Sequence, residues 1–431
     1  MEITLEGGEA PRYAPGGRGF VTGAELRRYP ELQIPEVNSG FEPLWWYEGR
    51  EYDCVRVGPA GAEARPAACV RETDLAGRSL PLWFKADTGP GQYRITATLS
   101  AAGDSREVLL FTGRRRLCWR GALKAEERVT VSALCDVSPV IASGGGDAAI
   151  SDLGLKEDKG VDLAVVGGTL VEVEIEPWTG PSLWIMGDST VTDQPAQVPY
   201  APGATYAGWG QMLPAYLGEQ YCVVNHAHSG LSTETFRDRG HYELVRQGLR
   251  TGDLVLLQFG HNDQKRKHLA ASTGYTENLG RYVRELRELG AVPVLVTSLA
   301  RNTWSSGSAY NDLLAPYAAA VKDLGRAMDV PVADLHGRMK ETVCRAGMEA
   351  AKVWFHPCDF THTNDFGAYM AAGFVAEELV RAGLAREAEA AAWPVHGPLD
   401  LPQPPEGLAP PEGTAPLVDY GLIPDAPWEI T

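Results

Sequence analysis

Short apolar or alternating runs fill the chain from about residue 41 to residue 177, and Gly, Pro and Asp residues separate them. Alternation puts every second side chain on one face of a strand. Short strands divided by turn residues are typical of antiparallel sheets that pack face to face. The pattern therefore predicts an antiparallel β-sandwich, with strands at residues 93–99, 107–111, 128–132 and 170–175 and a loop at residues 144–146.

The pattern changes at residues 177–181, where two prolines and a glycine interrupt it. Beyond this point continuous apolar runs alternate with helical stretches such as residues 276–289. Strands without alternation are typical of a parallel sheet that helices cover on both faces, and function collects at the carboxyl ends of its strands. The predicted strands are residues 183–186, 221–224, 254–259 and 292–296, and the predicted last helix is residues 369–384.

These patterns divide the chain into three parts. Residues 1–178 form the predicted β-sandwich domain, and residues 179–393 form the α/β domain. Ten of the thirty prolines fall in the final 38 residues, so residues 394–431 are predicted to be an irregular tail. Its apolar side chains favour a tail that packs back on a domain: Leu401, Leu417, Tyr420, Leu422, Ile423 and Trp428.

The chain has 39 lysines and arginines against 56 acidic residues, a formal charge of −17, which argues against a nucleic-acid partner. No uncharged apolar run reaches the roughly 18 residues of a membrane-spanning helix, and the first residues are acidic where a signal peptide is basic. We therefore expect no membrane partner and a cytoplasmic location. Seven scattered cysteines without a CxxC pair indicate reduced thiols.

The segment Gly187-Asp188-Ser189-Thr190 directly follows the predicted strand 183–186. A hydroxyl on the tight turn that leaves a buried strand is exposed at the sheet edge, and nearby N–H groups can face the same reacting atom. Ser189 is therefore a candidate nucleophile. The alternative is an ordinary turn or helix cap, in which an Asp or Ser side chain binds the backbone.

Asp359 and His362 lie just before the predicted last helix. Two residues three positions apart in a turn can approach each other. The carboxylate can then hold the imidazole in one tautomer while the other ring nitrogen takes a proton from Ser189. The alternative is that Asp359 and Asn364 only cap the helix and that His362 is a surface residue.

Candidate hydrogen-bond donors follow two further predicted strands. Gly230 lies in the loop after residues 221–224, and Asn262 lies in the loop after residues 254–259. Attack on an ester creates a tetrahedral oxyanion, which needs preorganised N–H donors. The backbone N–H groups of Ser189 and Gly230 and the side-chain amide of Asn262 are candidates for an oxyanion hole. Alternatively, Gly230 and Asn262 serve only as turn residues.

In this order and setting, Ser189, Gly230, Asn262 and His362 resemble the signature of the SGNH (GDSL) hydrolase superfamily, with Asp359 as the partner acid. The segments 187–190, 209–210, 260–263 and 359–364 look like the rhamnogalacturonan acetylesterase branch. The resemblance covers about residues 182–381. It implies a flavodoxin-like three-layer domain with a parallel sheet, often preceded in bacterial members by an all-β sandwich of jelly-roll, galactose-binding type.

The resemblance also implies a serine esterase without a cofactor, in which His362, oriented by Asp359, deprotonates Ser189. The implied substrate is an acetylated plant cell-wall polysaccharide or oligosaccharide, most of all pectic rhamnogalacturonan. Acetyl xylan or another acyl ester, such as a lipid or a thioester, is the alternative. The basic run Lys265, Arg266 and Lys267 follows Asn262 closely and either binds uronate carboxylates or is a solvated loop.

Two other classes stay open at this stage. A metallohydrolase would use metal-ligand residue types at strand ends but would leave Ser189 and Asn262 without roles. Its candidate ligands are His226, His228, His356, Asp359 and His362. A non-catalytic carbohydrate-binding protein is disfavoured by the intact set of five hydrolase residues. The aromatic residues 45–47 are either a sugar platform or core.

Overall fold

The structure is a computed structural model that describes residues 2–4, 13–21, 81–101, 103–143, 152–156, 158–196, 200–305, 309–357 and 359–386. Several sequence predictions lie outside the described residues. They are the loop at residues 144–146, the aromatic residues 45–47, the tail at residues 394–431, and the cysteines Cys54, Cys69 and Cys358.

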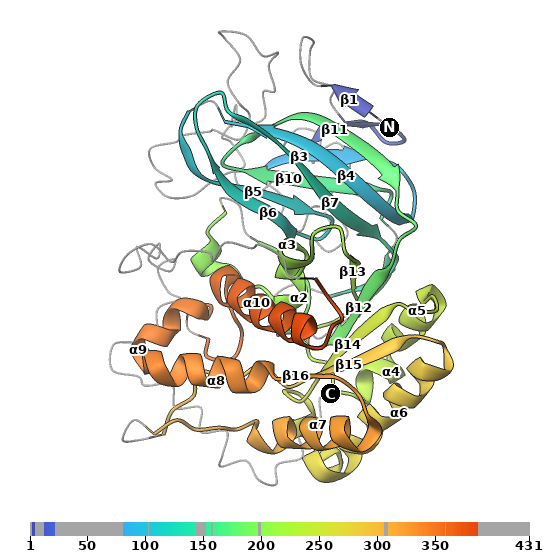
Figure 1. Ribbon diagram of the computed structural model, residues 1–431, viewed down its shortest axis with the longest axis vertical. Coiled ribbons are helices and arrows are strands. Elements are labelled where there is room, and N and C mark those ends of the chain that lie inside the picture. Colours follow the sequence, from blue (N-terminus) through green and yellow to red (C-terminus); the bar gives the residue numbers. More distant parts are fainter. Residues whose placement is uncertain are drawn as a thin grey trace.

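Antiparallel strands occupy the chain up to Pro177 and lie in the upper half of Figure 1. One sheet has the order β1-β11-β4-β7, a second has the order β2-β3-β10-β5-β6, and β8 pairs with β9. The predicted strands are confirmed as β4, β5, β7 and β11. The bounds are β1 (Glu2–Thr4), β2 (Arg18–Val21), β3 (Leu82–Ala86), β4 (Gly91–Ser100), β5 (Ser105–Thr112), β6 (Arg116–Leu123), β7 (Arg128–Val137), β8 (Val140–Ser143), β9 (Asp152–Lys156), β10 (Val161–Val166) and β11 (Thr169–Pro177).

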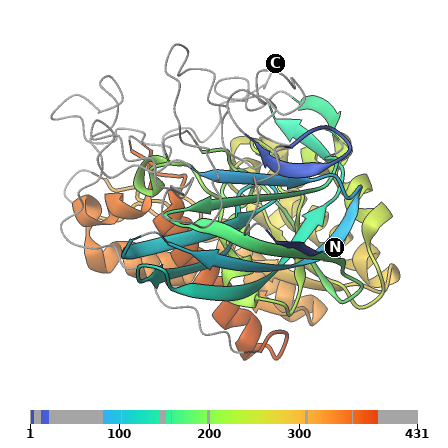
Figure 2. The same cartoon turned by 90° about the horizontal axis from the view of Figure 1, so that it is seen from above.

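The second of these sheets is buried on both faces. In β10, Leu163 and Val165 belong to a core shared with the first sheet, whereas Ala164 and Val166 belong to a core shared with the rest of the chain. This arrangement explains why β5 and β10 are continuous apolar runs, while β4, with one half-exposed face, alternates. Viewed from above, the antiparallel strands lie over the helical half of the molecule (Figure 2).

The remaining strands form a fully parallel sheet with the order β13-β12-β14-β15-β16. Numbered along the chain, this order is 2-1-3-4-5, which is flavodoxin-like and reverses direction beside β12. The predicted fold class is therefore confirmed, and only the two-residue strand β16 was not predicted. The bounds are β12 (Ser182–Gly187), β13 (Cys222–Asn225), β14 (Leu254–Gln258), β15 (Val292–Val296) and β16 (Val332–Ala333).

Helices cover both faces of the parallel sheet (Figure 1). In β12, Leu183 and Ile185 share a core with α2, α3, α8 and α10, and Trp184 and Met186 share another with α5, α6 and α7. The helix bounds are α2 (Trp209–Met212), α3 (Pro214–Leu217), α4 (Thr235–Asp238), α5 (His241–Gly248), α6 (Thr276–Glu288), α7 (Ala315–Met328), α8 (Leu335–Ala346), α9 (Met348–Ala351) and α10 (Asp365–Arg381). The helix predicted at residues 276–289 is confirmed as α6.

The last helix begins and ends earlier than the predicted residues 369–384. Asn364 caps α10, because its side-chain oxygen accepts a hydrogen bond of 3.0 Å from the Gly367 amide. Beyond Arg381 the chain reaches Gly383, whose φ of +69° suits glycine and ends the helix. β11 ends at Pro177 and β12 begins at Ser182, but the domain limits at residues 178 and 393 stay a prediction.

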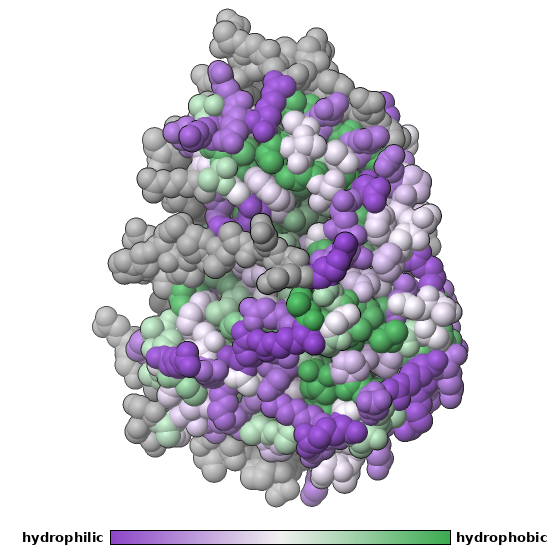
Figure 3. Space-filling model, in the orientation of Figure 1, coloured by the Kyte–Doolittle hydropathy of each residue, from purple (hydrophilic) through white to green (hydrophobic). Residues whose placement is uncertain are grey.

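Apolar and polar side chains are mixed on the face shown in Figure 3, and hydrophilic ones gather over its lower half. Among the helices that the structure describes, none is long and apolar enough to span a bilayer. Four described cysteines carry free thiols, of which Cys118, Cys135 and Cys222 are buried and Cys344 is exposed.

Candidate active site

Ser189 lies in the turn that follows β12, at the carboxyl edge of the parallel sheet. Gly187 allows this turn to form, because a Cβ atom there would lie 2.8 Å from the Gln258 carbonyl oxygen of the neighbouring strand. The Thr192 amide closes the turn with a hydrogen bond of 3.1 Å to the Asp188 carbonyl. The side chain of Ser189 is therefore presented beside the point where the strand order reverses.

Asp188 fixes the turn from below. Its buried carboxylate accepts hydrogen bonds from the Thr190 amide at 2.9 Å and the Thr190 hydroxyl at 2.8 Å, and His261 Nδ1 lies 3.2 Å away. Burial alone would raise the pKa of Asp188, but the interactions with His261 and Thr190 lower it below its ordinary value. The ionised carboxylate of Asp188 therefore binds Thr190, so the two neighbours of Ser189 in the chain are joined to each other.

The structure brings Ser189, His362 and Asp359 together in one chain of contacts. Ser189 Oγ lies 2.7 Å from His362 Nε2, and His362 Nδ1 lies 2.8 Å from Asp359 Oδ2. The other carboxylate oxygen of Asp359 accepts hydrogen bonds from the amides of Thr361 at 2.7 Å and His362 at 3.0 Å. Asp359 and His362 therefore lie in contact in this loop, and Asn364 alone caps the helix.

The environment of Asp359 keeps its carboxylate charged. Burial would raise the pKa of Asp359, but the contact with His362 and the two amide hydrogen bonds hold that pKa far below its ordinary value. His362 therefore faces a permanent negative charge at Nδ1 and a hydroxyl at Nε2. This is the arrangement in which an imidazole acts as a general base toward a serine.

Three candidate N–H donors lie in the loops that follow β12, β13 and β14 at the carboxyl edge of the parallel sheet. Neither the Ser189 amide nor the Gly230 amide donates a hydrogen bond to any acceptor among the described residues. Gly230 has a φ of +79°, a left-handed conformation that favours glycine. Asn262 Nδ2 donates to the Leu231 carbonyl at 3.0 Å, which uses one of its two N–H bonds. These groups can serve as the donors of an oxyanion hole.

Asp263 ties together the two loops that carry these donors. Its buried carboxyl group accepts hydrogen bonds from the Thr233 amide at 3.0 Å, the Thr233 hydroxyl at 2.6 Å and the Gly260 amide at 3.1 Å. Burial raises the pKa of Asp263 to about 7. Sequence reasoning gave Asp263 no role beyond its place in the resemblance.

The residues of the predicted basic run have different surroundings. Lys265 Nζ donates to Asn262 Oδ1 at 2.9 Å, so Lys265 contacts a candidate oxyanion donor. Arg266 instead forms an ion pair of 3.3 Å with Glu234. Lys267 is exposed in the short helical turn at Lys267–Leu269. Binding of uronate carboxylates by the run stays a prediction.

Two further residues flank His362 that sequence reasoning did not connect with it. The Tyr206 hydroxyl lies 3.4 Å from Asp359 Oδ2, and the Tyr206 ring stacks on His356 with ring centroids 3.6 Å apart. Tyr206 is 38% exposed, an unusual value for a large aromatic side chain. No sequence pattern points to Tyr206, because it follows a loop rather than a predicted strand.

The alternative metal ligands do not gather. Within the described ranges, no group of three or more His, Cys, Asp or Glu side chains is placed to hold a metal ion. His226 is buried against Trp184, with ring centroids 5.5 Å apart, and burial lowers its pKa to about 3. Asp359 and His362 contact each other and Ser189 instead.

Comparison with known proteins gives four matches. Residues 185–368 match the GDSL-like Lipase/Acylhydrolase family. The chain is 35% identical over 215 residues to rhamnogalacturonan acetylesterase RhgT of Bacillus subtilis, covering 47% of this chain and 90% of that protein. It is 30% identical over 210 residues to the probable rhamnogalacturonan acetylesterase YesY of the same species, covering 47% and 94%. Among solved structures, Bacillus subtilis YxiM has a TM-score of 0.45 and 23% identity, covering 70% of this chain and 81% of that chain.

Proposed function

The chain belongs to the GDSL-like lipase/acylhydrolase family and is a carboxylic ester hydrolase, and on this premise we propose that it removes O-acetyl groups from pectic carbohydrate with Ser189 as nucleophile. The observation that carries the proposal is the contact chain from Ser189 Oγ to His362 at 2.7 Å and from His362 to Asp359 at 2.8 Å. In serine esterases this geometry joins the nucleophile, the general base and the group that orients the base.

The first half-reaction acylates the enzyme. His362 Nε2 takes the hydroxyl proton of Ser189 while Oγ attacks the acetyl carbonyl carbon. Negative charge develops on the carbonyl oxygen, where the amides of Ser189 and Gly230 and the side chain of Asn262 stabilise it. Collapse of this intermediate breaks the bond to the sugar oxygen, which leaves with the proton from His362.

The second half-reaction restores the enzyme. His362 takes a proton from water, whose oxygen attacks the acetyl group on Ser189, and the same donors stabilise the second oxyanion. Collapse releases acetate and returns the proton to Ser189 Oγ. Asp359 stabilises the imidazolium that forms in each half-reaction, because it presents a charged oxygen 2.8 Å from His362 Nδ1.

The proposed substrate class is acetylated rhamnogalacturonan, either as polymer or as oligosaccharide. It is supported by the names of the relatives RhgT and YesY, each of which aligns with this chain over at least 90% of its own length. Acetyl xylan is the second candidate within the same chemistry. Because the site requires only an acetyl ester and a departing hydroxyl, the two candidates differ in sugar recognition and not in mechanism.

An acetate-release screen tests both the chemistry and the substrate. The wild-type chain, Ser189→Ala and the control Ser132→Ala, an exposed serine of β7, are incubated with acetylated rhamnogalacturonan, acetylated xylan and an aryl acetate. We expect the fastest release from rhamnogalacturonan and a loss of several orders of magnitude in Ser189→Ala only. Near-normal hydrolysis by Ser189→Ala would sink the assignment, and covalent labelling of Ser189 by a fluorophosphonate would exclude a mere binding protein.

We also propose that Arg266 and Lys267 of the basic run bind uronate carboxylates. The test uses Arg266→Gln and Lys267→Glu and leaves Lys265 intact, because Lys265 contacts Asn262. We expect KM to rise for acidic oligosaccharides and to stay unchanged for neutral acetyl esters. An equal rise for both substrates would refute charge recognition by this run.

A further inference from the structure

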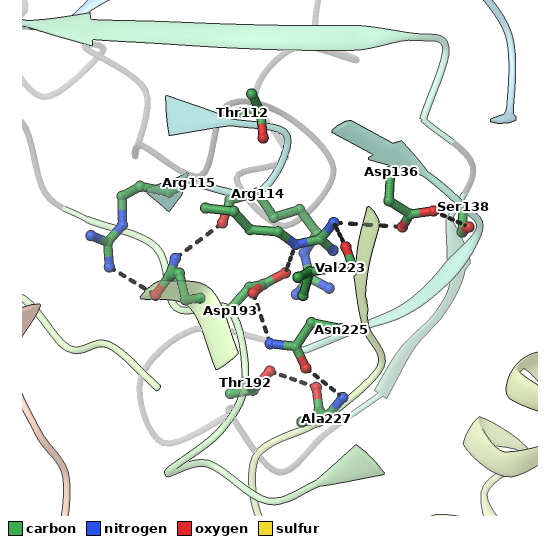
Figure 4. A network of polar contacts seen from close by, with 12 residues as sticks. Thr112, Arg114, Arg115, Asp136, Ser138, Thr192, Asp193, Val223, Asn225 and Ala227 are labelled. Atoms are coloured by element: carbon green, nitrogen blue, oxygen red, sulfur yellow. Dashed lines mark hydrogen bonds and ion pairs between the residues drawn. The ribbon is translucent and has the colours of Figure 1, made fainter. Parts of the chain in front are cut away.

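Arg115, in the turn between β5 and β6, and Arg116, the first residue of β6, reach from the antiparallel sheets to residues of the parallel-sheet half; Figure 4 shows this turn with Arg115 labelled. Arg115 has a φ of 60°, a conformation that non-glycine residues rarely adopt. Its side chain is fully buried, although a guanidinium is always charged. A strained backbone that carries a buried charge indicates that the side chain makes contacts the protein requires.

Arg115 contacts the loop that follows the nucleophile and the start of α10, the helix that follows His362. Its Nη1 donates to the two carboxylate oxygens of Asp365 at 2.9 and 2.7 Å, and its Nη2 donates to the Tyr206 carbonyl at 2.7 Å. Asp365 is the first residue of α10 and follows His362 by three positions. The Arg115 Nε group donates to the Gln194 carbonyl at 3.1 Å, on the loop that follows the nucleophile.

Gln194 passes this contact on to Ser189. Its side-chain Nε2 donates to the Ser189 carbonyl at 3.2 Å and lies 3.4 Å from Ser229 Oγ, next to Gly230. One arginine therefore reaches, directly or through a single residue, the nucleophile turn, a loop that carries an oxyanion donor, and the start of the helix behind the general base.

Arg116 holds the nucleophile turn from the other side. Its Nε donates to Asp193 Oδ2 at 2.9 Å and its Nη1 donates to the Val223 carbonyl of β13 at 3.1 Å. Asp193 in turn accepts a hydrogen bond of 2.9 Å from Asn225, which also donates to the Val191 carbonyl at 2.9 Å. The nucleophile turn and the strand that leads to Gly230 are thus fixed to the same guanidinium.

We propose that the β5–β6 turn is a positioning element of the active site, in which Arg115 and Arg116 hold the Ser189 turn and the Asp359–His362 loop in reacting geometry. Simple adhesion between the two halves does not require charge, because apolar side chains of similar volume stabilise a buried contact as well as an ion pair does. A guanidinium also fixes the orientation of its partners, since its planar set of N–H groups binds several acceptors at once.

Loss of either arginine should slow the reaction, because the proposed mechanism depends on contacts of 2.7 and 2.8 Å between Ser189, His362 and Asp359. A displacement of about 1 Å between reacting groups costs on the order of 100-fold in rate. Neither arginine contacts Ser189, His362 or Asp359 themselves, so their loss changes the rate of the chemical step and not the binding of a small substrate. This inference rests on the proposed serine mechanism.

The test compares Arg115→Lys and Arg115→Met with the control Lys85→Met in the full chain. Lys85 forms buried ion pairs with Asp158 at 2.9 Å and Asp162 at 3.0 Å within the antiparallel sheets, and it has no part in the site. All variants are assayed well below their own melting temperatures, with an aryl acetate and with a fluorophosphonate that labels Ser189.

We expect Arg115→Met to lower kcat and the labelling rate constant in parallel, by about 100-fold, and Arg115→Lys by about tenfold, with KM within twofold of wild type. Lys85→Met lowers the melting temperature and keeps kcat within twofold. Folded Arg115 variants with kcat within threefold of wild type would overturn the proposal, because a structural role alone predicts that result.

A second variant covers the case in which neither Arg115 variant folds. Gln194→Met removes only the half-exposed side chain through which Arg115 is linked to Ser189. We expect this variant to react about tenfold more slowly with the fluorophosphonate. An unchanged labelling rate in Gln194→Met would also overturn the proposal. If wild-type protein neither hydrolyses the aryl acetate nor reacts at Ser189, the proposed function fails instead, so the two failures are distinguishable.

Discussion

Replacing Asp359 by asparagine tests the orientation of the general base. Asp359 Oδ1 accepts two amide hydrogen bonds at 2.7 and 3.0 Å, and Oδ2 lies 2.8 Å from His362 Nδ1. In Asp359→Asn the amide oxygen must stay on the two backbone N–H groups, because the NH₂ group cannot accept their hydrogen bonds. The NH₂ group then faces Nδ1, and the imidazole proton moves to Nε2.

A proton on Nε2 leaves His362 unable to accept the hydroxyl proton of Ser189. The loss expected from this wrong tautomer is about 10⁴ in kcat, or about 5 kcal/mol of transition-state stabilisation. KM for an aryl acetate should stay near the wild-type value, because Asp359 contacts His362 and not the acyl group. Both constants are measured by steady-state hydrolysis of the aryl acetate.

The matched control is Asp312→Asn. Asp312 also pairs with a histidine, at 3.2 Å from His336 Nε2, but has no part in the proposed site. This variant should keep kcat within about twofold. If folded Asp359→Asn protein keeps kcat within tenfold of wild type, the role given to Asp359 is refuted.

The same reasoning fixes the pH dependence of the wild-type enzyme. The pKa of Asp359 is held far below its ordinary value, so this carboxylate stays ionised over the whole working range. Protonation of Asp359 therefore adds no step to the acid side of the kcat/KM profile measured with an aryl acetate. A drop in log kcat/KM centred on the ordinary aspartate pKa of about 3.9 would contradict this.

Three other variants give separate outcomes. Asn262→Ala removes one oxyanion donor and should lower kcat by about 10²–10³ with little change in KM, as measured on an aryl acetate. Lys265→Met removes the charge that lies 2.9 Å from Asn262 Oδ1. This variant should lower kcat by about tenfold for acidic and neutral substrates alike. A rise in KM confined to acidic oligosaccharides would instead assign Lys265 to substrate binding. Lys85→Met leaves Asp158 and Asp162 without their cation. We expect the free energy of unfolding, measured by urea titration, to fall by about 3–5 kcal/mol. A loss below about 1 kcal/mol would contradict the buried pairing.

The strand ends and the proposed catalytic residues could be located from the sequence for one physical reason. Consecutive apolar residues mark buried parallel strands, and their carboxyl ends converge on one edge of the sheet. Ser189, Gly230 and Asn262 each follow such a strand, so their approach needs no knowledge of the side-chain contacts. Asp359 and His362 are three residues apart, and their contact is local.

The supporting residues are long-range and could not be predicted in the same way. Arg115 binds Asp365, 250 positions away, through a turn whose left-handed conformation no local pattern encodes. β5 and β10 are buried on both faces, and each contains a continuous apolar run in the sequence. Such runs indicate that the antiparallel sheet containing them packs against the α/β half of the chain on its second face. The contact of Lys265 with Asn262 spans three positions in a short helical turn, whereas the sequence analysis offers only uronate binding or a solvated loop for Lys265.

The central claim is that Ser189 carries the acetyl group during turnover. The most direct measurement is mass spectrometry of peptides from acid-quenched reactions with acetylated rhamnogalacturonan oligosaccharide. We expect an acetyl group on the peptide that contains Ser189, formed within the first turnover and absent from Ser189→Ala protein. Acetate release by wild-type protein with no acetylation of that peptide at any quench time, or equal release by Ser189→Ala, would contradict it.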